Sequence, residues 1–381
     1  MVSRRKLNAL LISLLALTIV QVIRVPQKPQ RLTVTKTPST TGLIGNFREP
    51  ALLSSSEGAT QTMDELNRQY TGLLGHHDMS HYLTMGCSAS RQLERDFVDT
   101  GGENQKKRVQ SWMRNAKIMV DCPNVIDAFK FYHNVPPFVH RIWECDTIPD
   151  RYSAALETWI SNTAGMFVFL WTNEVRRHFI NNTFGSTHLT LYDRIVPGAY
   201  RADLFRYVIM YLFGGVYSDM DSHLLQNLSN LINDFEHFVT VVTDLDISRL
   251  LNGAILVAPP RQALFLCAFG EVFDHSEKRL MFNSDLDVSG PGVLGECLRH
   301  VVGKDDMRFT EGNAMELRTQ GFNILRSHLE SNGGRHVVML NESTTLLTLE
   351  HGGETYHRDV TPDCDPGEHY SALHAKGTIY Q

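Results

Sequence analysis

The chain has 381 residues, a net charge of −6 with its histidines neutral, and 42% hydrophobic residues. This length accommodates one large domain with additional segments, and the composition is that of an ordinary globular protein. No basic stripe is interleaved with aromatic residues, which argues against a nucleic-acid-binding protein.

The N-terminal segment predicts a membrane anchor. Arg4, Arg5 and Lys6 precede a mostly apolar run from Leu7 to Val25. That run has the length of a short membrane span or of a long signal-peptide core. Its C-terminal flank lacks the small residues that a signal peptidase reads, and basic residues stay on the cytosolic side of a membrane. We predict an uncleaved type II signal anchor over residues 1–25, with a cleaved signal peptide as the alternative.

The next segments differ in composition. Residues 26–78 are rich in Pro, Thr, Ser, Gln and Lys, which predicts a flexible stem. Residues 79–133 form an accessory helical region, with helices expected at Gln105–Val120 and Val125–His133. The main folded domain is expected over residues 134–381.

The cysteines and sequons bear on the compartment of the chain. No cysteine pair has C-x-x-C spacing, which disfavours a zinc site. Disulfides are compatible with a lumenal domain. For Cys267, which lies inside an apolar run, a buried free thiol is at least as good a prediction as a disulfide. Sequons begin at Asn181, Asn227 and Asn341.

The main domain begins with alternating strand and helix patterns. They are a β-rich run ending at Trp143, a helix burying Leu156, Trp159 and Ile160, an apolar strand at Phe167–Trp171, and a helix from Asn173 through Phe179. A strand that is apolar throughout is typical of a sheet buried on both faces. The order predicts parallel strands covered by helices.

A second strand–helix unit ends in two carboxylates. The apolar helix Tyr200–Phe213 stops at Gly214-Gly215, and a strand is expected over Val216–Asp219. On an extended chain Asp219 and Asp221 point the same way, one pleat apart. Two such carboxylates repel unless a cation lies between them, and hard oxygen ligands suit Mn²⁺ or Mg²⁺.

The same helix carries charged residues near its start. Asp203 and Arg206 are one helical turn apart and share a face with each other. Because the helix is strongly apolar, it is expected to be buried, and a buried ion pair needs partners or a purpose.

Later elements complete the expected domain. Strands are expected at Phe238–Thr243 and Asn252–Pro259, a helix at Gln262–His275, and a glycine-rich turn at Ser289–Gly292. Such a turn lets backbone N–H groups approach a sugar or a phosphate.

The stretch from Arg201 to Arg206, followed by Gly214 to Asp221, resembles the sugar-binding region of DXD-containing glycosyltransferases of family 32. That family includes fungal Golgi mannosyltransferases and mannosyl-inositol-phosphoceramide synthases, and clostridial glucosylating toxins are more distantly similar. The resemblance implies a GT-A fold, a Rossmann-like mixed sheet flanked by helices, over residues 134–381. It also implies a retaining hexosyltransferase that needs no obvious general base.

The resemblance assigns roles to individual residues. It implies catalytic roles for Asp203, Arg206, Asp219 and Asp221, and stacking of Trp143 on the nucleotide base. Donor-binding residues would further include Arg201, Tyr217, Asn252 and Gly290. The metal ligands would be Asp219, Asp221 and, from the C-terminal tail, His374, with His369 as a rival because Ile379-Tyr380 replaces the tryptophan of the family.

Together, the predicted anchor and this resemblance imply a Golgi type II membrane enzyme with a lumenal domain. It would use Mn²⁺ or Mg²⁺ to transfer a hexose, first of all mannose from GDP-mannose, to a hydroxyl of a glycan or glycolipid. The alternatives are a metal-dependent nucleotide-sugar phosphohydrolase and an inactive membrane-anchored scaffold of the same fold. A glycosidase is disfavoured because its carboxylates face each other across a sugar at ~5–9.5 Å.

Overall fold

A computed structural model describes residues 104–121, 135–163, 165–228, 239–244, 249–250, 254–304, 307–330, 335–350 and 369–381. The predicted signal anchor, the stem, the helix at Val125–His133 and the candidate Asn252 lie outside these residues. No helix within the described ranges combines the length and the hydropathy needed to cross a bilayer.

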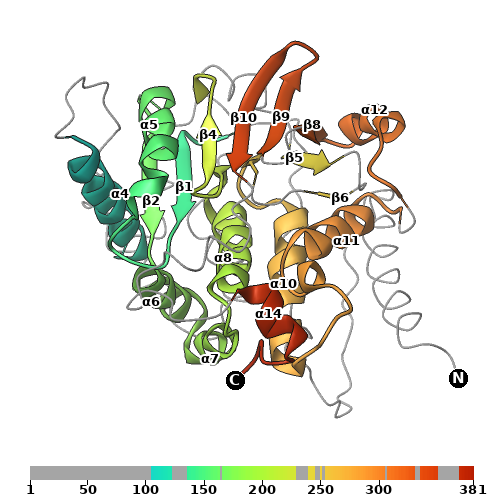
Figure 1. Ribbon diagram of the computed structural model, residues 1–381. Helices are drawn as coiled ribbons and strands as arrows, with labels where there is room; N and C mark the ends of the chain where they lie inside the picture. Colours follow the sequence, from blue (N-terminus) through green and yellow to red (C-terminus); the bar gives the residue numbers. More distant parts are fainter. Residues whose placement is uncertain are drawn as a thin grey trace, which may run out of the picture. The chain divides into compact units, whose positions relative to one another are not determined.

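Helices and strands alternate through the first part of the domain (Figure 1). The helices are α4 (Asn104–Asp121), α5 (Ser153–Asn162), α6 (Asn173–Phe184), α7 (Ser186–Arg194), α8 (Gly198–Phe213), α10 (Ala263–Lys278), α11 (Pro291–Val301), α12 (Glu311–Thr319) and α14 (Tyr370–Ala375), with short 3-10 turns η3 (Asp150–Tyr152) and η4 (Asp285–Asp287). The strands are β1 (Phe138–Ile142), β2 (Phe167–Trp171), β3 (Gly215–Tyr217), β4 (Ser222–Leu224), β5 (Val239–Asp244), β6 (Arg249–Leu250), β7 (Leu256–Ala258), β8 (Phe322–Leu329), β9 (Arg335–Asn341) and β10 (Thr344–Glu350).

The described strands form one mixed sheet in the order β2-β1-β3-β7-β5-β8-β9-β10-β4, with β6 paired to β5. Strand β1 runs parallel to β2 and β3, and β5 runs parallel to β8. The pairs β3–β7, β8–β9, β9–β10 and β10–β4 are antiparallel. The mixed α/β architecture that the resemblance implied is therefore present, whereas the element pattern alone indicated only its parallel half.

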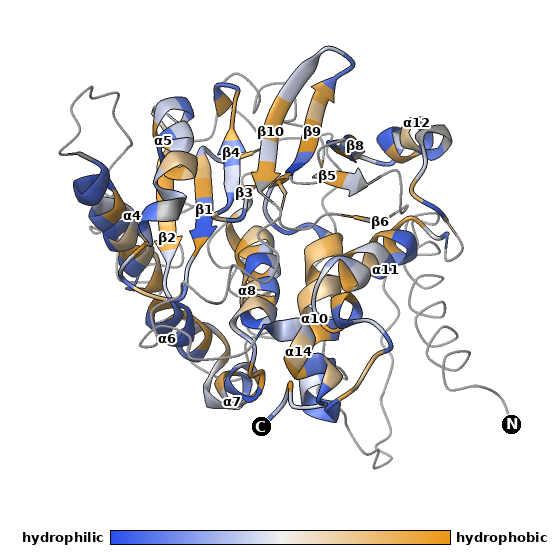
Figure 2. Cartoon of the chain, viewed as in Figure 1, coloured by the Kyte–Doolittle hydropathy of each residue, from blue (hydrophilic) through white to orange (hydrophobic). Residues whose placement is uncertain are grey.

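Side-chain alternation along the strands supplies two hydrophobic cores. Phe167, Phe169 and Trp171 of β2 belong to one core, together with residues of α8 and α10. Val168 and Leu170 belong to the other, together with the buried face of α5. Because successive side chains of a strand point to opposite faces, the sheet is covered on both sides, as the continuously apolar strand predicted. Figure 2 shows β2 and α10 coloured largely as hydrophobic.

Helix α8 is buried almost all round. It packs against β1 and β3 of the sheet and against α10 on its other side. A helix between two layers needs apolar side chains on more than one stripe, which is why its sequence shows little amphipathic character. Charged residues in such a helix are held in place by the surrounding packing.

Two glycines end α8 and start β3. Gly214 has φ +60° and Gly215 has φ +92°, a region that L side chains rarely adopt. A Cβ at Gly214 would lie 2.5 Å from the backbone nitrogen of Pro260, and one at Gly215 would lie 2.6 Å from the carbonyl oxygen of Phe138. Both positions require glycine, and the chain reverses here to enter β3, an interior strand of the sheet.

Several expected elements are confirmed, and others need correction. The helices expected at Gln105–Val120, Tyr200–Phe213 and Gln262–His275 are present as α4, α8 and α10. The strand expected at Val216–Asp219 is shorter, because β3 ends at Tyr217. Cys267 is not a free thiol: it forms a disulfide with Cys297, joining α10 to α11.

Candidate active site

The two aspartates lie on a turn that connects β3 to β4. The backbone N–H of Ser222 donates to the carbonyl oxygen of Asp219 at 3.2 Å, so residues 219–222 form a tight turn with Met220 and Asp221 at its centre. The prediction that Asp219 and Asp221 lie one pleat apart on an extended strand is therefore wrong. The carbonyl of Asp219 is held by this local bond, which ends the strand before the first carboxylate.

The carboxylates nevertheless remain electrostatically coupled. Burial, and then the charge of Asp219, raise the pKa of Asp221 to about 7. One carboxylate oxygen of Asp221, Oδ1, is buried and has no hydrogen-bond partner among the described residues. A buried carboxylate oxygen without a partner is costly, so this atom is a candidate ligand for a cation.

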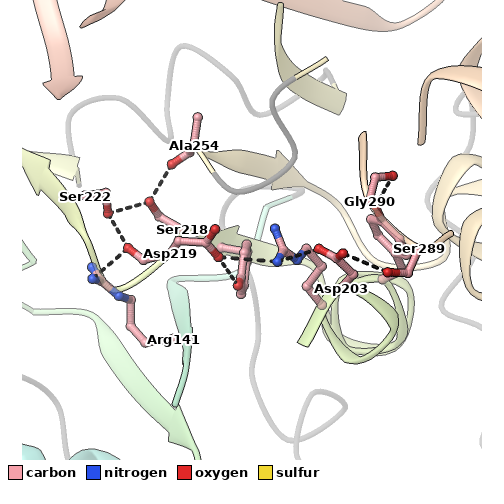
Figure 3. A network of polar contacts seen from close by, with 11 residues as sticks. Arg141, Asp203, Ser218, Asp219, Ser222, Ala254, Ser289 and Gly290 are labelled. Carbon is pink, nitrogen blue, oxygen red and sulfur yellow. Dashed lines mark hydrogen bonds and ion pairs between the residues drawn. The ribbon is translucent and has the colours of Figure 1, made fainter. Parts of the chain in front are cut away.

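Arg206 connects the acidic turn to helix α8. Its Nη2 lies 2.7 Å from Oδ1 of Asp203 and 3.5 Å from Oδ1 of Asp219 (Figure 3). The guanidinium also lies over the ring of Tyr217 at 4.8 Å. Burial acts to lower the pKa of Arg206, but Asp219 and Asp203 raise it, so the side chain is a permanent cation. The buried pair expected on α8 is present, and its partner is the acidic turn.

Tyr217 is fixed beside the same carboxylate. Its hydroxyl donates to Oδ1 of Asp219. Burial, with the charge of Asp219, raises the pKa of Tyr217 well above its usual value. The phenol therefore stays protonated and acts as a donor to Asp219.

The glycine-rich turn before α11 closes on Asp203 from the other side. The hydroxyl of Ser289 donates to Oδ2 of Asp203 at 2.8 Å, and the hydroxyl of Tyr207 donates to the carbonyl oxygen of Gly290 at 3.0 Å (Figure 3). A Cβ at Gly290 would lie 3.1 Å from the carbonyl oxygen of Leu286 and 3.4 Å from Oδ2 of Asp203. The turn that carries Gly290 is thus adjacent to Asp203, whose carboxylate bridges α8 and this turn.

Trp143 directly follows β1, and Arg201 lies near the start of α8. Trp143 is only 4% exposed, packs edge-on against Tyr152 at 4.9 Å and donates from Nε1 to the carbonyl oxygen of Thr147. Its stacking on a nucleotide base stays a prediction. Arg201 Nη2 lies 3.6 Å from Oε2 of Glu144, and the other oxygen of Glu144 pairs with the buried Arg176.

The C-terminal helix α14 packs against α8 and η4, beside the same region, and the metal role of His374 stays a prediction. Nε2 of His374 is buried and has no hydrogen-bond partner in the part of the chain that the structure describes. Within the described residues, no three His, Cys, Asp or Glu side chains are close enough to hold one ion, so Asp219, Asp221 and His374 are not brought together. The rival His369 caps α14, because its Nδ1 accepts from the backbone N–H of Ser371.

Further contacts anchor α14. The ring of Tyr370 packs against Tyr200 at 5.6 Å between centroids, and Ser371 donates to Asp285 of η4. Burial, followed by the charges of Asp285 and Asp203, raises the pKa of Tyr370 to about 12. The tail therefore lies next to the Asp203 side of the site.

The residues present fit a hard divalent cation. Asp219 and Asp221 offer carboxylate oxygens, and Oδ1 of Asp221 lacks a partner among the described residues. Mg²⁺ and similar ions are typically held by one or two carboxylates, with waters and substrate phosphates filling the other positions. The turn can therefore supply the protein ligands, and a phosphate-bearing substrate can supply the rest.

Comparison with known proteins assigns this region to a family. Residues 149–239, which include α8, the Gly-Gly reversal and the acidic turn, match the family described as "Glycosyltransferase sugar-binding region containing DXD motif". The chain contains a DXD-type glycosyltransferase sugar-binding region. The resemblance inferred from Asp203, Arg206, Asp219 and Asp221 is therefore confirmed at the level of the family.

Several curated relatives share this region. An uncharacterized glycosyltransferase of Acanthamoeba polyphaga mimivirus is 28% identical over 141 residues, which is 36% of this chain and 56% of that protein. Inositol phosphoceramide mannosyltransferase 3 of Schizosaccharomyces pombe is 32% identical over 99 residues, 26% of this chain and 28% of that protein. The initiation-specific alpha-1,6-mannosyltransferase of Saccharomyces cerevisiae is 20% identical over 190 residues, 46% of this chain and 40% of that protein. The chain thus spans about half of the length of these relatives, or less.

Among solved structures, the PaToxG glycosyltransferase shares 11% identity with this chain. The superposition covers 53% of this chain and 79% of that protein, with a TM-score of 0.35.

Sequence reasoning missed several polar residues of the site. Arg141, Ser218, Ser222 and Glu144 all lie in or next to it. A charged Arg141 inside the strand leading to Trp143 was the available signal, because a charge in a buried strand needs a partner. The serines carry no such signal, since serine is common in turns of every kind.

Proposed function

We propose that the chain is a metal-dependent glycosyltransferase of GT-A type that moves a hexose from a nucleotide sugar to a hydroxyl of a glycan or glycolipid, with retention. The observation that carries the proposal is the continuous contact from Ser289 through Asp203 and Arg206 to Asp219. Near it lies Oδ1 of Asp221, which no described residue meets with a hydrogen bond. This arrangement combines a polar sugar-binding edge with a pair of hard oxygen ligands.

The proposed roles follow from the charges and the contacts. A bound divalent cation would neutralise the charge that develops on the diphosphate leaving group. Asp203, held by Arg206 and Ser289, would accept hydrogen bonds from sugar hydroxyls. Arg206 would donate to the sugar or the phosphate while keeping Asp219 in place. These groups are fixed before the substrate arrives, and such preorganisation is the main source of electrostatic stabilisation in enzymes.

The sugar and the compartment belong to the same proposal. Two of the relatives are named as mannosyltransferases, which supports mannose, carried by GDP, as the first donor to test. The described disulfide between Cys267 and Cys297 supports an oxidising compartment such as the Golgi lumen. A type II orientation with a lumenal domain is compatible with the disulfide and with the mannosyltransferase relatives.

The test is a panel of nucleotide sugars incubated with the purified chain and Mn²⁺, scored for nucleotide release with and without a mannosylated acceptor. We expect release from one donor, strongest with acceptor present, and lost in Asp219→Asn and Asp221→Asn. Asp274→Asn serves as a control, because Asp274 pairs with Lys278 on α10 outside the site described above. Acceptor-independent release of phosphate would favour a phosphohydrolase, and turnover that survives both site variants would refute the metal role.

A further inference from the structure

Arg141 is an unusual residue for a central strand. It belongs to β1, its side chain is completely buried, and burial lowers its pKa to about 10, which leaves it charged at neutral pH. Its guanidinium lies over the ring of Trp159 at 4.3 Å. Its Nη2 donates to the backbone carbonyl oxygen of Asp219 at 2.9 Å (Figure 3). Burying a charge costs free energy, which contacts such as those with Trp159 and the turn must offset.

Hydrogen bonds to the carbonyl oxygen of Asp219 hold the acidic turn in its conformation. It accepts from Arg141, from the hydroxyl of Ser222 at 2.6 Å and from the backbone N–H of Ser222 at 3.2 Å. Two side-chain donors and one backbone donor on the same carbonyl define the direction of the peptide group that follows Asp219. That peptide group leads directly to Met220 and Asp221.

Further hydrogen bonds hold Ser222 itself. Nε1 of Trp159 donates to the carbonyl oxygen of Ser222 at 2.8 Å, and the hydroxyl of Ser218 lies 2.7 Å from that of Ser222. Ser218 also contacts the carbonyl oxygen of Ala254 (Figure 3). Ser218 and Ser222 are completely buried. The backbone on both sides of Asp219 is therefore held by a closed polar network, and Arg141 is its charged member.

We infer that Arg141, together with Ser222, is a positioning residue for the two carboxylates of the acidic turn. By fixing the carbonyl of Asp219 it sets the turn, so that the Asp219 and Asp221 side chains are presented to one cation without rearrangement. Groups behind the ligands of a metal site orient those ligands, and their removal typically weakens metal binding by roughly 10- to 100-fold. The inference rests on the proposed metal-dependent function, and it names residues that do not themselves touch the cation.

A role in positioning differs from a role in charge neutralisation. Arg141 carries a positive charge near both carboxylates, and a charge effect alone would oppose cation binding. Arg141→Lys keeps the charge but loses the planar guanidinium that reaches the Asp219 carbonyl. Ser222→Ala changes no charge and removes a second donor to the same oxygen. Only the positioning role predicts weaker cation binding in both variants.

The test is a titration of the purified chain with Mn²⁺ alone, followed by the electron paramagnetic resonance signal of the free ion. We expect Arg141→Lys and Ser222→Ala to bind Mn²⁺ roughly 10- to 100-fold more weakly than wild type. The matched control is Ser276→Ala, because the hydroxyl of Ser276 is equally buried and donates to a backbone carbonyl, that of Leu191, outside the turn. Thermal unfolding of all three variants verifies that each folds, and Ser276→Ala should bind Mn²⁺ like wild type.

Each outcome bears on one idea. If the folded Arg141→Lys and Ser222→Ala variants bind Mn²⁺ as wild type does, while Asp219→Asn and Asp221→Asn do not, the positioning role is overturned and the metal site stands. If Ser276→Ala weakens Mn²⁺ binding as much as Ser222→Ala, the effect is general destabilisation and the positioning role again fails. If wild type and both aspartate variants bind Mn²⁺ equally or not at all, the proposed function and this inference fall together.

Discussion

His140 gives a stability prediction that needs no substrate. The side chain is completely buried in β1, its Nδ1 accepts from Nε1 of Trp171 at 3.2 Å, and its Nε2 lies 3.0 Å from the carbonyl oxygen of Gly214. Both contacts are satisfied by one neutral tautomer, with the proton on Nε2. Burial lowers the pKa of His140 from 6.5 to about 3, because a charged imidazole would lose its hydration.

The sign and size of the pH effect follow from this pKa. Between pH 3 and 6.5 the unfolded chain binds a proton at His140 and the folded chain does not, so the free energy of unfolding falls as the pH drops below 6.5. Proton linkage gives a loss of about 2 kcal/mol between pH 7 and pH 5. This figure changes little as long as the folded pKa stays below about 4.

The assay is urea unfolding of wild type and His140→Gln at several pH values from 5 to 8. Glutamine offers both an acceptor and a donor but does not titrate in this range. The variant is expected to be less stable at pH 7, yet the gap to wild type should narrow by about 2 kcal/mol on going to pH 5. Parallel pH profiles for the two proteins would refute the assignment of a buried neutral His140.

Three further predictions follow from local geometry. Ser289→Ala removes the hydroxyl that donates to the carboxylate of Asp203 and should lower kcat/KM for the nucleotide sugar about tenfold. Ser289→Thr keeps the hydroxyl and should retain the wild-type kcat/KM. Equal kcat/KM values for wild type and both variants would contradict the orienting role. Gly214→Ala places a Cβ 2.5 Å from the backbone nitrogen of Pro260 at a positive φ. It should lower the free energy of unfolding in urea by more than about 3 kcal/mol. A variant as stable as wild type would show that the fold does not require glycine at this position. Cys267→Ser should lower the free energy of unfolding by about 3 to 4 kcal/mol, because the lost disulfide closes a loop with a sequence separation of 30. A reductant should then lower the stability of the variant less than that of wild type.

The elements that sequence reasoning placed well are those with strong local signals. Strand β2 was expected at its exact bounds because five consecutive buried apolar residues leave no choice of face. Helix α8 was expected within two residues because its apolar run ends at two glycines whose backbone only glycine can adopt. In contrast, α7 and the hairpin β9–β10 were missed. The strands β9 and β10 pair with each other, but the hairpin joins this part of the sheet through the pairing of β10 with β4, a strand far earlier in the chain.

The acidic motif shows where local reasoning fails. Its residues favoured an extended strand through Asp219, but hydrogen bonds from Arg141 and Ser222 to the Asp219 carbonyl make a turn instead. Arg141 lies 78 residues away from Asp219 along the chain, so no local pattern could reveal that bond. Similarly, Cys267 reads as a buried thiol within its helix, and only the packing of α10 on α11 brings Cys297 within bonding distance.

By itself the sequence determined the order of strands and helices at the start of the domain and the identity of the sugar-binding motif, because propensity, apolar runs and the spacing of Asp203, Arg206, Asp219 and Asp221 act over a few residues. Only the tertiary structure decided how the sheet is completed and which distant side chains hold the motif. Those contacts join segments whose separation along the chain carries no signal, and they form because a buried polar group must find its partner wherever folding places one.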